Sequence, residues 1–158
     1  MTPAAEGVPE ELERALGLGY RFLAHRDRTE VEMRAHLSGR GVQPEVADRT
    51  VAELVEQGYL DDVRFAHRFA EDRRTLDHWG SERIERRLRE LGIGRALATE
   101  AAAPGEEGEL DAAVALLARR FPSPPREERD LNRALGLLVR RGYELELAHD
   151  AIQAYRRD

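Results

Sequence analysis

Apolar residues recur at helical spacing along most of the chain, and one short phrase of this pattern occurs three times. The three copies are LSGRGV (37–42), LRELGI (88–93) and LVRRGY (138–143). Their glycines, Gly41, Gly92 and Gly142, lie 51 and 50 residues apart, and a fixed period of this size indicates tandem structural units. Glycine suits the left-handed backbone that ends a helix, and the apolar residue after it can pack back on that helix. Each repeat is therefore predicted to contain a helix, a glycine turn and another helix.

A further amphipathic stretch precedes each of these helix pairs. The three stretches are expected at Pro9–His25, Asp61–Leu76 and Gly108–Phe121. Thr29 followed by Glu32 has the pattern of a capping box, and Pro44 occupies a favourable first helical position. Helix-breaking segments separate the stretches, for example APGEEG (103–108) and FPSPP (121–125). The sequence therefore predicts an all-α fold with nine helices, three in each repeat.

The repeat period also predicts how the chain is organised. Residues 1–8 are expected to form a flexible N-terminal tail. Three-helix, helix-turn-helix-like repeats are then expected at residues 9–58, 59–104 and 105–158. Units stacked in a row contact only their neighbours and expose much surface for each residue. We therefore predict an elongated tandem array, and we expect a monomer.

Composition narrows the class of protein. Charged residues make up 35% of the chain and aromatic residues 6%, a balance that suits a helical protein with wide hydrated faces. The absence of cysteine excludes disulfides and thiolate metal sites. No apolar run approaches the ~20 residues needed to span a bilayer, and the first residues do not resemble a signal peptide. A cytoplasmic protein without membrane contact is the expectation.

Arginine is concentrated in the middle of a chain whose net charge is −6. From Arg73 to Arg95 there are 7 arginines and 4 acidic residues, so the local balance is +3. The candidate partner-binding residues in this stretch are Arg73, Arg74, Arg83, Arg86, Arg87 and Arg89. If Ile84, Leu88 and Leu91 face inward, Arg83, Arg86 and Arg89 share the opposite helix face. Two interpretations remain open: the face is only solvated, or it is a binding surface.

The sequence offers little that supports catalysis. His149-Asp150 has the composition of a metal phosphohydrolase dyad, but such a pair near the end of an amphipathic helix is typical of an exposed surface. Asp61-Asp62 is better explained as a helix start than as a cation site. No glycine-rich phosphate loop follows a strand. Trp79 is expected to pack between the first two repeats, with an exposed partner anchor as the alternative. We therefore expect no catalytic residue, no metal and no cofactor.

Three stretches of the chain resemble the RecX family of bacterial RecA regulators. They are GYLDDVRFA (58–66), GSERIERRLRELGI (80–93) and REERDLNRALGLLVRRGYELELAHDAI (126–152). The resemblance covers about residues 10–157. It implies three tandem three-helix repeats in an elongated, curved molecule.

The resemblance also implies a function. RecX proteins bind RecA and RecA–DNA filaments and curb ATP hydrolysis, strand exchange and coprotease activity, without catalytic residues of their own. They act in homologous recombination, DNA repair and the SOS response. Weak direct DNA binding also belongs to the family, although the acidity of this chain argues against a strong form of it. The alternative hypothesis is a small helix-turn-helix DNA-binding protein that acts without RecA.

Overall fold

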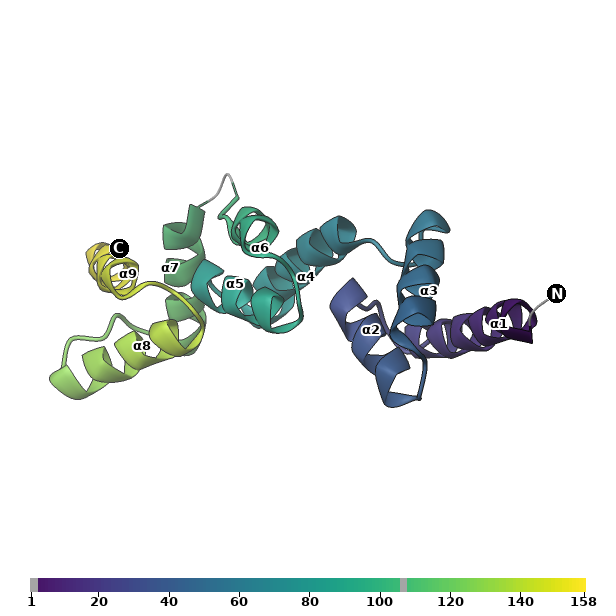
Figure 1. The fold of residues 1–158 in the computed structure, drawn as a ribbon. Coiled ribbons are helices and arrows are strands. Elements are labelled where there is room, and N and C mark those ends of the chain that lie inside the picture. Colours follow the sequence, from purple (N-terminus) through teal and green to yellow (C-terminus); the bar gives the residue numbers. More distant parts are fainter. Residues whose placement is uncertain (1–2, 106–107) are drawn as a thin grey trace. The chain divides into compact units, whose positions relative to one another are not determined.

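The computed structural model describes residues 3–105 and 108–158, and all regular structure in these ranges is helical (Figure 1). The helices are α1 (Pro3–Leu23), α2 (Glu30–Gly39), α3 (Pro44–Glu56), α4 (Asp62–Asp77), α5 (Ser81–Glu90), α6 (Arg95–Ala102), α7 (Gly108–Arg120), α8 (Glu128–Arg140) and α9 (Leu145–Arg157). The predicted all-α class is thus confirmed for the described residues. Residues 106 and 107, in the predicted APGEEG break, lie outside them.

Helix α1 begins at Pro3 rather than at the predicted Pro9. The prediction placed Pro9 in the first turn, where proline is favoured because its missing N–H has no intrahelical partner. In the structure Pro9 lies inside the helix, so the helix takes in residues 3–8 of the predicted tail. The first two residues of that tail lie outside the described part of the chain.

The local signals for helix ends are confirmed. Thr29 caps α2 through a complete capping box with Glu32, and Pro44 stands at the start of α3. The three repeat glycines all have a left-handed backbone, with φ of 82° at Gly41 and 97° at Gly92 and Gly142. After α8, the Tyr143 amide bonds to the Leu138 carbonyl at 3.0 Å, which is the long bond of a Schellman ending.

The chain divides into two compact units, and the division falls within α4. Unit 1 contains the residues up to Ala66 together with Glu90–Ile93, and unit 2 contains His67–Arg89 and Gly94–Asp158. In unit 1, α1, α2 and α3 enclose a core whose most buried members are Ala15, Met33, Leu37, Val51 and Leu54. In unit 2, α7, α8 and α9 enclose another, which includes Leu117, Ala134, Leu138, Tyr143 and Ala151.

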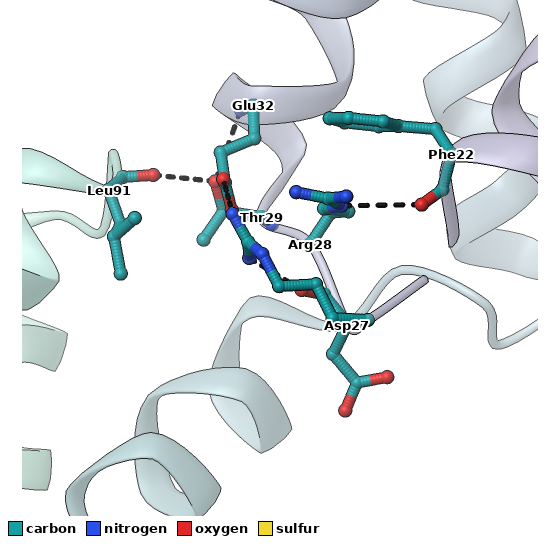
Figure 2. A network of polar contacts seen from close by, with 7 residues as sticks. Phe22, Asp27, Arg28, Thr29, Glu32 and Leu91 are labelled. Carbon is teal, nitrogen blue, oxygen red and sulfur yellow. Dashed lines mark hydrogen bonds and ion pairs between the residues drawn. The ribbon is translucent and has the colours of Figure 1, made fainter. Parts of the chain in front are cut away.

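The glycine turn after α5 docks on the start of α2 within unit 1 (Figure 2). The Thr29 hydroxyl is fully buried, accepts a hydrogen bond from the Glu32 amide at 3.1 Å and donates one to the Leu91 carbonyl at 2.6 Å. Gly92 lies against Val31 so closely that a Cβ atom added at Gly92 would be 2.4 Å from the Val31 Cβ. The turn therefore needs glycine both for its backbone conformation and for this close approach.

A similar joint occurs inside unit 2, between the glycine turn after α8 and the start of α5. The Gly80 amide donates to the Arg141 carbonyl at 2.7 Å, and the Glu82 amide donates to the Gly142 carbonyl at 3.2 Å. A Cβ atom added at Gly142 would be 2.2 Å from the Arg83 Cβ. In both joints the carbonyl of the residue before the glycine accepts a hydrogen bond from the residue that precedes a helix. In its second and third copies the repeated phrase therefore connects helices that are distant in sequence, whereas an added Cβ atom at Gly41 of the first copy meets nothing within 4 Å.

Candidate partner-binding surface

Helix α5 is strongly amphipathic, as its sequence predicts. Ile84 and Leu88 on its inner face are fully buried. Arg86, Arg87 and Arg89 are exposed on the other side. The exposure of these arginines follows from the helical periodicity, because the apolar residues four positions apart face the interior and leave the other side of the helix to solvent. We call these three arginines the α5 arginine face.

The other three candidate arginines have structural partners. Arg74 donates to the carbonyls of Ala102 and Ala103. These carbonyls are at the C-terminal end of α6, where carbonyl groups lack intrahelical partners and favour a cation. Arg74 therefore caps α6, and it is not part of the α5 arginine face.

Arg73 and Arg83 lie near the single tryptophan. Arg73 forms an ion pair with Asp77 one turn along α4. The guanidinium of Arg83 lies 4.1 Å from the centroid of the Trp79 ring, and it donates to the Arg140 carbonyl at 3.0 Å. The Phe69 ring meets Trp79 edge to face at 6.1 Å. These half-buried arginines thus contribute to the packing of unit 2.

The structure corrects the expectation for Trp79. Its ring contacts are with Phe69 and Arg83, and it lines a cleft together with Arg119 and Arg120 of α7. The prediction that Trp79 packs between the first two repeats is therefore wrong. The indole instead faces residues of the predicted third repeat, because the turn after α4 brings it beside α7.

Sequence reasoning did not single out the arginines of α7 and of the turn after α8. Arg119, Arg120 and Arg141 lie in the same cleft as Arg73 and Arg83. The only signal for them was their occurrence in two adjacent pairs, Arg119-Arg120 and Arg140-Arg141, each at the end of a helix. Such pairs are common near helix C-termini, since cations are favoured there.

The residues considered for catalysis behave as structural or surface groups. Asp61 accepts a hydrogen bond from the Arg64 amide at 3.0 Å, and Asp62 accepts one from the Glu30 amide at 3.0 Å. The helix-start interpretation of Asp61 and Asp62 is thereby confirmed, with Asp62 serving α2 rather than its own helix. His149 and Asp150 are exposed on α9. Among the described residues, no group of three or more histidine, cysteine or acidic side chains could hold a metal ion.

None of the described helices is both long enough and apolar enough to cross a membrane.

Comparison with known proteins identifies similar sequences and folds. A family model described as "RecX, first three-helix domain" matches residues 15–54, and one described as "RecX, second three-helix domain" matches residues 61–101. The regulatory protein RecX of Deinococcus radiodurans is 32% identical over 154 residues, which cover 90% of this chain and 74% of that protein. The regulatory protein RecX of Cronobacter sakazakii is 33% identical over 156 residues, which cover 92% of both chains.

A solved structure gives the same result for the fold. The crystal structure of RecX from Lactobacillus salivarius superposes with a TM-score of 0.82 and covers 95% of this chain and 99% of its own. Its sequence is only 16% identical, so the likeness concerns the fold alone. Each of the two matched family domains lies within one of the predicted repeats, 9–58 and 59–104.

Proposed function

The chain belongs to the RecX family, and we propose that it is a non-catalytic regulator that binds RecA and RecA–DNA filaments. Binding inhibits the recombinase, ATPase and coprotease activities of the filament. The observation that carries the proposal is the match to the RecX domains, which extends over both units and includes α5.

The α5 arginine face is the proposed contact surface. Arg86 and Arg89 are exposed and make no hydrogen bond or ion pair in the described part of the chain. Exposed ion pairs on a helix contribute only ~0.2–1 kcal/mol, so fold stability gives little reason for so many arginines on one helix. Guanidinium groups are well suited to the carboxylates of a partner protein, because each can bind a carboxylate with two parallel hydrogen bonds.

In the proposed mechanism, the repeats contact successive RecA protomers of one filament. A molecule that bridges protomers opposes the shifts between them that accompany ATP turnover, or it weakens the contact at a filament end. A tandem array suits this role since each repeat can bind one protomer, and linked binding events raise the overall affinity. This mechanism assumes three repeats, with boundaries at residues 58–59 and 104–105.

The test reverses the charge of two exposed arginines, Arg86→Glu with Arg89→Glu. Like charges across an interface cost several kcal/mol, so the variant should need at least tenfold more protein for half-inhibition of the RecA ATPase on single-stranded DNA. Its free energy of unfolding should fall by no more than about 1–2 kcal/mol, since each surface substitution usually costs up to ~0.5 kcal/mol and the new glutamates lie four residues from Glu82, Glu85 and Glu90. Arg83 is left unchanged because it packs against Trp79 and the Gly142 turn.

A matched control carries Arg21→Glu with Arg49→Glu, two exposed arginines of unit 1. Both variants have the same net charge, so a nonspecific charge effect would weaken them equally. Full inhibition by the folded Arg86/Arg89 variant would place the contact surface elsewhere. Absence of inhibition by the wild-type protein would refute the regulatory role itself.

The alternative hypothesis, a helix-turn-helix DNA-binding protein that acts without RecA, makes a different prediction. It requires binding to duplex DNA in the absence of RecA, with log affinity falling steeply and linearly as log salt rises. Contact with acidic protein side chains gives a shallower dependence on salt. We expect the shallower dependence, since the chain carries a net charge of −6.

A further inference from the structure

Unit 2 contains an open cleft of 690 Å³ beside the turn that follows α4. This volume lies within the range of about 300–1,000 Å³ that is usual for small-molecule sites. Residues of α4, of α5, of α7 and of the turn after α8 line it. Its arginines are Arg73, Arg83, Arg119, Arg120 and Arg141, and Asp77 is its only acidic lining residue.

The cleft is strongly positive in an acidic chain. Five arginines and one aspartate give a formal charge of +4 when His78 is neutral, whereas the whole chain carries −6. The positive charge of the cleft also acts on His78. Its pKa is lowered, first by burial and then by the charges of Arg119 and Arg141. Like charges gathered around one concavity repel each other and focus their field in it. Packing and helix-end contacts account for single arginines, but the gathering of five around one concavity favours an anionic ligand.

Several of the guanidinium groups are held in place by the fold. Arg141 donates to the Asp77 carbonyl, Arg83 donates to the Arg140 carbonyl at 3.0 Å, and Arg119 lies 2.7 Å from Nε2 of His78. A guanidinium group has five N–H donors, so one such anchor leaves other donors available. Anchored donors lose less conformational freedom when a ligand binds. The cleft therefore presents oriented cationic donors.

Trp79 offers little room for stacking on a nucleobase. The Arg83 guanidinium covers one face of its ring at 4.1 Å, and the Phe69 ring meets it edge to face. A ligand would therefore be recognised through its charge and its hydrogen-bond acceptors rather than through an aromatic surface.

We propose that this cleft binds closely spaced phosphate groups. A single carboxylate is satisfied by one guanidinium fork, but five arginines that line one cleft and a formal charge of +4 fit a polyvalent anion with many acceptor oxygens. Such phosphates occur in a free oligophosphate chain, as in a nucleoside triphosphate, and this is the ligand class that the inference assigns to the cleft. The inference goes beyond the proposed RecA regulation and does not depend on it, because it rests on the cleft alone.

The experiment uses Trp79, the only tryptophan of the chain, as a reporter inside the cleft. The full-length protein is titrated with sodium tripolyphosphate at low ionic strength, and sodium chloride of equal ionic strength serves as the blank. The expected result is a saturable change in tryptophan fluorescence, with calorimetry giving the same dissociation constant. Arg119→Gln with Arg120→Gln should weaken binding at least tenfold, since both side chains are exposed on α7 and their loss leaves the helix intact.

The matched control is Arg21→Gln with Arg49→Gln in unit 1, which removes the same charge outside the cleft. Tripolyphosphate binding should be unchanged in this control. Equal weakening in the two variants would overturn the proposal, because it would reveal nonspecific attraction. Absence of a saturable signal with the wild-type protein would overturn it as well.

Two further titrations identify the source of the phosphate. Oligothymidylate of eight nucleotides that binds more tightly than tripolyphosphate, at equal phosphate concentration, would overturn the proposal in favour of the direct DNA binding attributed to the family. The opposite order would support a free oligophosphate. Octaglutamate that binds more tightly than both would overturn the proposal in favour of an acidic peptide. None of these readouts involves RecA, so failure here is distinct from failure of the proposed function.

Discussion

The two equivalent glycines of unit 1 allow a sharp test of the joint between the α5 turn and α2. Gly41 and Gly92 both have a left-handed backbone, with φ of 82° and 97°. Alanine at either position therefore carries a similar backbone cost of ~1–2 kcal/mol. Their surroundings differ: a Cβ atom at Gly41 meets nothing within 4 Å, whereas one at Gly92 would be 2.4 Å from the Val31 Cβ.

Gly92→Ala should consequently destabilise unit 1 more than Gly41→Ala does. The Val31 Cβ is bonded directly to the backbone of α2 and cannot swing away, so the turn or the helix must shift. Overpacking of this kind costs ~1–3 kcal/mol. We expect losses of about 1–2 kcal/mol for Gly41→Ala and about 2–5 kcal/mol for Gly92→Ala, by adding the backbone and packing costs.

The measurement is urea unfolding followed by far-UV circular dichroism, analysed from midpoints at a common slope. Because both glycines lie in the same unit, the two variants report on the same core. A difference below about 0.5 kcal/mol would refute the reasoning, since that is the scatter expected of neutral substitutions. It would mean that the turn after α5 does not rest on Val31 in solution.

Three other predictions concern the caps, the core and the shape. Thr29→Val should lower the free energy of unfolding in urea by about 2–4 kcal/mol, because it removes a helix cap and leaves the buried Leu91 carbonyl without its donor. Thr29→Ser keeps the hydroxyl and should cost about 1 kcal/mol or less. Equal losses in the two variants would contradict the role given to the Thr29 hydroxyl. Burial, followed by the charge of Glu109, raises the pKa of Tyr143 to about 12. In an absorbance titration one of the four tyrosines should therefore ionise late, and the stability from its neutral form should be present below pH 10 and lost as pH rises towards 12; four tyrosines that titrate together near pH 10 would contradict this shift. Small-angle scattering should give a radius of gyration clearly above the ~15 Å of a compact domain of this length, and a value at 15 Å would reject the tandem array predicted from the repeat.

Much of the helical framework was predictable because its signals are local. The capping box at Thr29, the proline that starts α3 and the glycines that end α2 and α8 act within one or two helical turns. Their effect does not depend on distant residues. The exception was the start of α1, where a proline that usually marks a first turn lies inside the helix.

The candidate site was predictable only in part. Periodicity correctly identified Arg86 and Arg89 as exposed, because buried Ile84 and Leu88 determine which side chains face outward. It was wrong for Arg83, which was expected on the same face but is half-buried against Trp79. It did not determine what half-buried arginines contact. Arg74 caps a helix 27–29 residues further along the chain, and Arg83 donates to a carbonyl 57 residues away. Such partners depend on which elements meet in space.

The sequence by itself determined the helices, their turns and the apolar faces, because each follows from interactions between residues at most a few positions apart. Only the tertiary structure decided how the repeated glycine phrase is used and where the arginines gather. The close approach at Gly92 exists because the turn after α5 meets α2 within unit 1. The positive cleft exists because α4, α5, α7 and the turn after α8 converge at Trp79. Convergence of this kind depends on the packing of whole helices, so a local sequence pattern does not predict it.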